Sequence, residues 1–156
     1  MDGLGIVDFG ATPTDTVKAV RDYLGFNKTD DSGWGPAWGD YGACPGTEYR
    51  QVRFGGLYLS FSDVDRFQPA GTRQFISWAF VGDPAIVIPF GADIGMTLAD
   101  LQSLYPTATV AYDDLWFGHH FLVEGPVFGE QLWGTLTGPN PGDTIDYLTG
   151  GVGCGE

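Results

Sequence analysis

Basic residues are scarce in this 156-residue chain and absent from its second half. The sequence has seven Lys and Arg against twenty Asp and Glu, none of the seven follows Arg73, and the formal net charge is −13 at pH 7. Nucleic acids and anionic membranes are bound mainly through Lys and Arg, so this charge argues against both as ligands. Such a surface is typical of a highly soluble protein, or of one that binds a basic partner or Ca²⁺.

Long apolar segments are also absent. No apolar run approaches the roughly 20 residues that span a bilayer, so we expect no membrane insertion by this chain segment. The opening MDGLG lacks the basic start and apolar stretch of a signal peptide. An extracellular or cell-envelope location, which we favour below, would therefore require a leader or lipid anchor that is absent from this chain.

Cysteine and histidine each occur only twice, which limits thiol and metal chemistry. Adjacent residues of a strand point to opposite faces, so His119 and His120 cannot readily bind one metal ion. Cys44 and Cys154 would be two unrelated thiols in a cytosolic protein but would pair in an exported one. We favour the Cys44–Cys154 disulfide, which would tie the C-terminal tail to the first half of the chain.

Motifs of the common catalytic classes are missing. There is no G-x-S-x-G sequence, no Cys beside a plausible base, no P-loop and no G-x-G-x-x-G in a β-α-β context. Asp30-Asp31-Ser32-Gly33 and Asp63-Val64-Asp65 offer oxygen ligands for Ca²⁺, but neither matches an EF-hand loop, and solvated turns explain both. We expect no enzymatic activity, no cofactor and no metal centre.

Two helix starts share one pattern. Thr12 suits an N-cap and Asp15 the third helical position, and an apolar stripe follows, which predicts a helix over residues 13–24. Thr97 and Asp100 repeat this arrangement before a second stripe. Alternating apolar segments follow each helix, including a hairpin around Gly55-Gly56 and a strand over 73–82, and Trp78, Phe80, Phe121 and Trp133 are their predicted core aromatics.

These features predict an α+β fold made of two tandem repeats, each with a helix packed on an antiparallel sheet. The first repeat would cover residues 1–84 and the second 85–156, within one compact unit. The Gly- and Pro-rich segment 27–48 is the least regular part of the sequence. It is too long to be a simple connector, and such loops often bind a ligand or wrap the core.

Residues 9–17 and 94–101, each an apolar-Gly-(Ala or Met)-Thr-x-x-Asp start, resemble the tandem repeats of the β-lactamase inhibitory protein family of streptomycetes. The single unit resembles the small outer-membrane-assembly lipoproteins of the BamE/SmpA type. The phrases GLGIVDFGAT, CPGTEYRQVRFGGL and GGVGCGE look like uncharacterised exported or lipid-anchored proteins of actinobacteria. The resemblance implies helices packed twice on antiparallel sheet and a binding role without catalysis. The inhibitor has a cysteine pair within each repeat, whereas this chain has one Cys in each half.

Aromatic residues outside the predicted strands form a candidate binding surface together with nearby acids. These aromatics either cover the edges of the sheet or supply exposed anchors for a protein or stacking platforms for a sugar. The candidate binding residues are Trp34, Trp38, Tyr41, Asp113, Asp114, Trp116 and Phe117.

The sequence favours an exported, non-enzymatic module that binds a protein partner, either as an inhibitor or within the cell envelope. The partner would carry a basic surface, because the chain is so acidic. A glycan- or calcium-binding extracellular module is the alternative, and an unidentified hydrolase is a third. Two carboxylates facing one another in a pocket would favour the hydrolase, and aromatics lining a cleft would favour the glycan.

Overall fold

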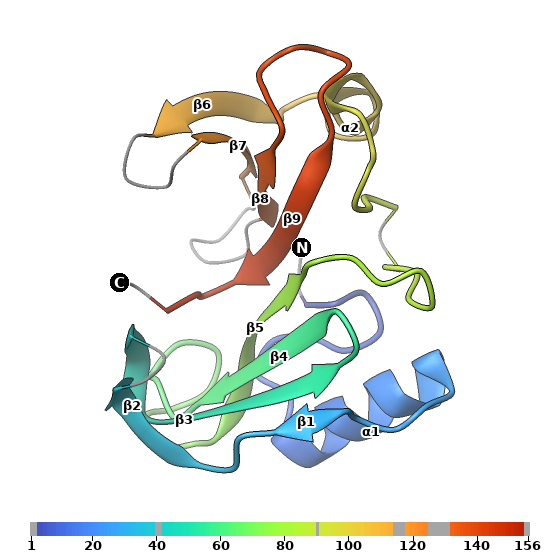
Figure 1. Cartoon of the computed structure of the whole chain (residues 1–156). Helices are drawn as coiled ribbons and strands as arrows, with labels where there is room; N and C mark the ends of the chain where they lie inside the picture. The colour runs from blue at the N-terminus through green and yellow to red at the C-terminus, as the bar shows by residue number, and fades with distance from the viewer. Residues whose placement is uncertain (1–2, 40–41, 90, 114–117, 125–131, 155–156) are drawn as a thin grey trace.

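The computed structural model describes residues 3–39, 42–89, 91–113, 118–124 and 132–154 (Figure 1). The helices of this part of the chain are α1 (Pro13–Leu24) and α2 (Leu98–Leu104). Its strands are β1 (Asp30–Asp31), β2 (Gly35–Gly39), β3 (Gly42–Phe54), β4 (Leu57–Ser62), β5 (Gln74–Phe80), β6 (Thr109–Asp113), β7 (Gly118–Val123), β8 (Leu132–Leu136) and β9 (Ile145–Gly151). None of the described helices is long and apolar enough to cross a membrane.

All of these strands belong to one antiparallel sheet. Its order is β1-β3-β4-β5-β9-β8-β7-β6, and β2 pairs additionally with β3. Strands β5 and β9 meet in the middle, from the pair Ser77–Gly151 to the pair Phe80–Leu148. This contact joins the strands that precede α2 to those that follow it, so the sheet is continuous across both halves of the chain.

The predicted fold of two helix-on-sheet repeats is wrong. A single continuous sheet dominates the structure, and the two helices contain only 12 and 7 residues. The repeated Thr-x-x-Asp sequence is a local capping signal, which marks where a helix begins and carries no information about how distant strands pair. The short α2 ends before Pro106, which cannot continue a helix.

Both predicted helix starts are confirmed. The Thr12 hydroxyl accepts a hydrogen bond from the Asp15 backbone N–H at 3.2 Å and donates to the Asp15 carboxylate at 2.7 Å. Thr97 and Asp100 form the same pair of bonds at the same two distances. Gly25, in a left-handed conformation, ends α1 after Leu24, where the predicted helix also ends.

The predicted hairpin is also confirmed, because β3 and β4 are joined by Gly55-Gly56. The segment 27–48 is more regular than its Gly and Pro content suggests, since it holds β1, β2 and the start of β3. Edge strands tolerate proline where the missing N–H would point away from the ladder, so Pro36 can lie within β2.

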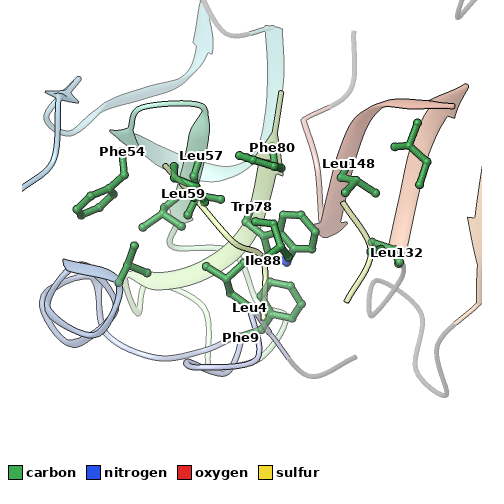
Figure 2. Close-up of a cluster of buried hydrophobic side chains, with 14 of the residues drawn as sticks. Leu4, Phe9, Phe54, Leu57, Leu59, Trp78, Phe80, Ile88, Leu132 and Leu148 are labelled. Carbon is green, nitrogen blue, oxygen red and sulfur yellow. The ribbon is translucent and has the colours of Figure 1, made fainter. Parts of the chain in front are cut away.

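Alternation along the strands separates the two faces of the sheet. The buried residues Leu57, Leu59 and Phe61 alternate with Tyr58 and Ser60 along β4. Their side chains join a cluster that includes Trp78 and residues of both helices, part of which is drawn in Figure 2. The labelled members of this core are Leu4, Phe9, Phe54, Leu57, Leu59, Trp78, Phe80, Ile88, Leu132 and Leu148.

Cys44 and Cys154 form a disulfide, as predicted, with a sequence separation of 110 residues. On the chain-entropy model, closing a loop of this length stabilises the fold by about 4–5 kcal/mol. The bond fastens the tail that follows β9 to β3, and the Val152 N–H donates to the Ile76 carbonyl at 2.9 Å on the way. A disulfide of this kind is typical of proteins from oxidising compartments.

Two glycines allow β9 to approach the core at the centre of the sheet. A Cβ atom on Gly150 would lie 2.8 Å from Nε1 of the buried Trp78 indole. A Cβ atom on Gly151 would lie 2.2 Å from the Ile76 carbonyl oxygen, and its φ of 89° already disfavours other residues. Larger residues at these positions would therefore force β5 and β9 apart.

We predict that Gly150→Ala lowers the free energy of unfolding by about 1–3 kcal/mol, because the added methyl group overlaps a rigid, buried ring. Urea denaturation followed by tryptophan fluorescence measures this change. The matched control is Gly142→Ala, whose Cβ would meet no atom within 4 Å. Equal stability of the two variants would contradict the close approach of β9 to Trp78.

A half-buried ion pair fixes β1 to β3. The Arg50 guanidinium donates to both carboxylate oxygens of Asp31, at 2.9 and 2.6 Å, and Lys28 donates to the same carboxylate. The Arg50 hydrogen bonds are the main reason that the pKa of Asp31 is far below its usual range. The folded state is thus stabilised above the unfolded pKa of about 3.9, and this stabilisation is lost as the pH falls below it.

We predict that Asp31→Asn lowers the free energy of unfolding at pH 7 by about 1.5–3 kcal/mol, the range for hydrogen bonds to charged groups. The deficit relative to the unmodified protein should shrink between pH 5 and pH 3, which urea denaturation at both pH values tests. The control is Asp22→Asn, because Asp22 pairs with Lys18 and Arg21 at the exposed surface of α1 and should contribute little at either pH. A difference in the free energy of unfolding that stays constant with pH would contradict stabilisation by the ionised Asp31 carboxylate.

Candidate functional site

The open face of the sheet carries a groove of about 480 Å³. Strands from both halves of the chain build it, because β3, β4 and β5 supply one side and β6, β7, β8 and β9 the other. The described residues that line it are Tyr49, Gln51, Ser60, Ser77, Trp78, Ala79, Asp113, His120, Trp133, Tyr147, Thr149, Gly150, Gly151, Gly153 and Cys154.

Strand register explains why this face is polar. Gln51 pairs with Ser60, and Ser60 pairs with Ser77, so three polar side chains lie in one row across β3, β4 and β5. The neighbouring row, with Val52, Leu59 and Trp78, faces the hydrophobic core. Side chains alternate between the two faces along each strand. The polar residues next to the core-facing positions therefore point to the opposite face and form the floor of the groove.

Tyr49 forms the wall on the β3 side. Its side chain is almost fully buried and packs with Ala37, Cys44 and Cys154, so the disulfide supports this wall directly. The Tyr49 hydroxyl shares a 2.8 Å hydrogen bond with the Ser60 hydroxyl. The wall is therefore held by covalent, apolar and hydrogen-bonded contacts before any ligand binds.

Aromatic rings form the opposite wall. Trp133 and Tyr147 meet edge to face, with centroids 5.6 Å apart and planes at 79°. The His120 ring lies 6.3 Å from the Trp133 ring between centroids. Burial raises the pKa of the Tyr147 hydroxyl, so this group remains a neutral hydrogen-bond donor over the physiological range.

His120 lines the groove and also contains a buried polar atom. Its Nδ1 atom is buried and has no hydrogen-bond partner among the described residues. His119, the adjacent residue, points to the other face of the strand, where its ring lies 5.0 Å from the Tyr112 ring between centroids, with the planes tilted by 57°. The prediction that the two histidines cannot share one ion fits this arrangement.

Charged side chains are scarce among the described residues that line the groove. Asp113, at the end of β6, is the only Asp, Glu, Lys or Arg among the described residues that line it. Within the described ranges, no group of three or more His, Cys, Asp or Glu side chains is placed to hold a metal ion. The described lining can therefore offer hydroxyl groups, aromatic rings, the Asp113 carboxylate and the His120 imidazole to a ligand.

The candidate residues from the sequence lie in different places. Asp113 lines the groove, whereas Trp34 and Trp38 are not among the described lining residues. Trp34 is half-buried against the core, and the Arg73 guanidinium lies 4.3 Å from its ring centroid. Trp38 is 72% exposed on β2. Tyr41, Asp114, Trp116 and Phe117 lie outside the described residues.

Sequence reasoning missed most of the groove. Trp133 was expected in the core with Trp78, Phe80 and Phe121, but it lines the groove, while the other three are buried. The available signal was the alternation in EQLWGTLTG and DTIDYLTGG, which places Trp133 and Tyr147 opposite the apolar leucines. The alternation shows that these strands have a face opposite the core. It does not show that β3–β5 and β6–β9, which are far apart in the sequence, build one groove on that face.

Comparison of the chain with protein-family models, with curated proteins and with solved structures gave no match.

Proposed function

We propose that the protein is an exported, non-enzymatic binding module that holds a segment of a protein partner in the groove on the open face of its sheet. The groove itself is the observation that carries this proposal: it measures about 480 Å³ and is bounded by strands of both chain halves. Its size falls within the range of ligand-binding clefts, and an inserted loop or side chain of a partner would fill it.

The composition of the groove supports protein recognition. The half-buried rings of Trp133 and Tyr147 offer aromatic contact area at small cost in side-chain entropy, and Tyr49, Ser60 and Ser77 form a largely buried polar floor and wall behind them. Antibody paratopes use this same combination of Tyr, Trp, Ser and Gly. Trp and Tyr are also enriched among the residues that contribute most of the binding energy at protein interfaces.

The rigidity of the groove supports binding as well. Most of its described lining residues lie on paired strands, and the Cys44–Cys154 disulfide packs against Tyr49. A preformed site loses little conformational entropy when it binds, which improves affinity. The same disulfide favours an extracellular or cell-envelope location, because disulfides persist in oxidising compartments.

A glycan-binding module is the second candidate, and one observation favours it. The Trp133 and Tyr147 rings border a groove that is rich in hydroxyl groups, and sugars stack on aromatic rings and bond to hydroxyls. The hydrolase has less support, because Asp113 is the only carboxylate among the described lining residues, whereas glycosidases use a pair. No described cluster favours calcium.

We predict that a partner captured on the immobilised protein from culture medium and cell-envelope extracts depends on Trp133. Trp133→Ala should weaken its binding at least tenfold, as expected when an aromatic anchor is removed. Trp38→Ala is the matched control, because it removes an exposed Trp that does not line the groove. Mass spectrometry identifies the partner, and surface plasmon resonance measures the affinities.

Folding of each variant is checked by its thermal unfolding, and Tyr147→Phe provides a second groove variant that removes only a hydroxyl group. A partner that is lost with Trp38→Ala but retained with Trp133→Ala would place the site on the segment 27–48 and overturn the groove proposal. Specific capture of polysaccharide in place of protein, lost with Trp133→Ala, would favour the glycan-binding alternative.

A further inference from the structure

We propose that the partner segment is held as an added strand on the open edge of β6, beside the groove, and that this segment carries Lys or Arg. This inference rests on the proposed function and specifies how the segment binds. In this mode of recognition, backbone hydrogen bonds to the edge provide affinity and alternate side chains provide specificity. Three features support it: the unprotected edge, the continuity of β6 with the groove, and the charge of the chain.

Strand β6 forms one end of the sheet, at the far end from β1 (Figure 1). Among the described strands it pairs only with β7. In an antiparallel pair, alternate residues direct their N–H and C=O groups toward the partner strand, and the residues between them direct these groups away from it. The outward groups of β6 are therefore a template for a further extended chain.

The two ends of the sheet differ in how they are protected. At the other end, β1 has only two residues, and β2 contains Pro36 and a register shift between Pro36 and Trp38. Short strands, prolines and bulges are devices that prevent pairing at an edge. Strand β6 has five residues, pairs with β7 in unbroken register and contains no Pro, Lys or Arg. Of the two ends, β6 is therefore the one that can accept another strand.

The side chains of β6 connect this edge to the groove. Asp113 lines the groove, so Ala111, two residues earlier, lies on the same face of the strand. Val110 and Tyr112 lie on the other face, where Val110 packs against the core and the Tyr112 ring meets that of His119. Ala111 is exposed, and Tyr112 is 61% exposed. A segment held in the groove can continue beside β6, with alternate side chains on the groove face and next to Tyr112.

The charge of the chain selects the occupant of this edge. Backbone pairing itself accepts any extended sequence, including β6 of a second copy. The formal net charge is −13, and no Lys or Arg follows Arg73, so strands β6 to β9 contain acids but neither of these basic residues. A second copy would bring the same charge and be repelled, whereas a segment with Lys or Arg is attracted. The charge therefore favours a basic segment of another protein.

The test uses the strand-forming peptide Ac-Arg-Val-Thr-Val-Arg-NH₂. It is titrated into the ¹⁵N-labelled protein with its disulfide intact, and amide hydrogen exchange is followed by NMR. We expect the β6 amides that point away from β7 to exchange at least tenfold more slowly when the peptide is bound, because they then donate to its carbonyl groups. The control peptide has the same sequence with its Val-Thr-Val amides N-methylated. It lacks these donors, its methyl groups obstruct the edge, and it should give no protection.

A second pair of peptides tests the charge. Ac-Glu-Val-Thr-Val-Glu-NH₂ has the same strand-forming centre and the opposite charge, and it should bind at least tenfold more weakly than the Arg peptide at low salt. Raising the salt concentration should reduce this difference. Equal or tighter binding of the Glu peptide would overturn the basic character of the segment.

Two proline variants, Ala111→Pro and Tyr112→Pro, locate the site on the protein. Adjacent residues direct their N–H groups to opposite sides, so one variant removes an outward donor and the other removes a bond to β7. Thermal unfolding separates them, because proline is tolerated on an edge strand where its missing N–H would face solvent. The more stable variant, here called the outward variant, should fold like the unmodified protein and lose the Arg peptide. Full retention of the peptide by this variant would overturn the location on β6.

The remaining outcomes separate this inference from the proposed function. A captured partner that is lost with Trp133→Ala but retained by the outward variant would overturn the edge pairing and keep the groove. The reverse result would support the edge pairing and overturn the groove. Protection of β6 by neither peptide at millimolar concentration, or equal protection by the N-methylated peptide, would overturn the edge pairing. A concentration-dependent dimer in sedimentation that the outward variant does not form would overturn the choice of occupant in favour of a second copy.

Discussion

The pairing of β5 with β9 is the interaction on which the rest of the structure depends. Each of these strands would otherwise be the edge of a smaller sheet and would leave a row of backbone hydrogen-bonding groups exposed. Their pairing closes both edges and produces one sheet. Gly150 and Gly151 make this possible, because any larger residue would overlap Trp78 or the Ile76 carbonyl. The absence of a side chain at Gly150 and Gly151 is thus what allows the two halves of the chain to pair.

The groove is a direct consequence of that pairing. Its floor includes Ser77 and Gly151, which face one another across the β5–β9 contact, and its walls stand on the strands to either side. The helices and the apolar side chains occupy the opposite face, so the open face can be polar and aromatic without loss of core packing. The Cys44–Cys154 disulfide then fixes the tail beside Tyr49. A rigid concave face remains, in which Asp113 is the sole described carboxylate.

Local features of the fold could be predicted from the sequence, but their assembly could not. Thr12 and Thr97 cap helices through contacts three residues away, and Gly55-Gly56 joins two adjacent strands, so short-range rules are sufficient for both. The repeated cap suggested a duplicated unit, yet the pairing of β5 with β9 involves residues more than 60 positions apart and has no local signature. Trp133 was misassigned for the same reason, because its surroundings depend on which strands become neighbours.

Native-state hydrogen exchange of the disulfide-intact protein tests the central claim, that β5 and β9 unite the two strand sets in one cooperative unit. The informative amides are those of β4, of β8 and of Val152, which bonds to Ile76 across the junction. The structure predicts that the most protected amides of β4 and β8 open with the same free energy, equal to that of global unfolding, and that Val152 is protected with them. Separate opening of the two strand sets, with Val152 exchanging as a free amide, would contradict the account.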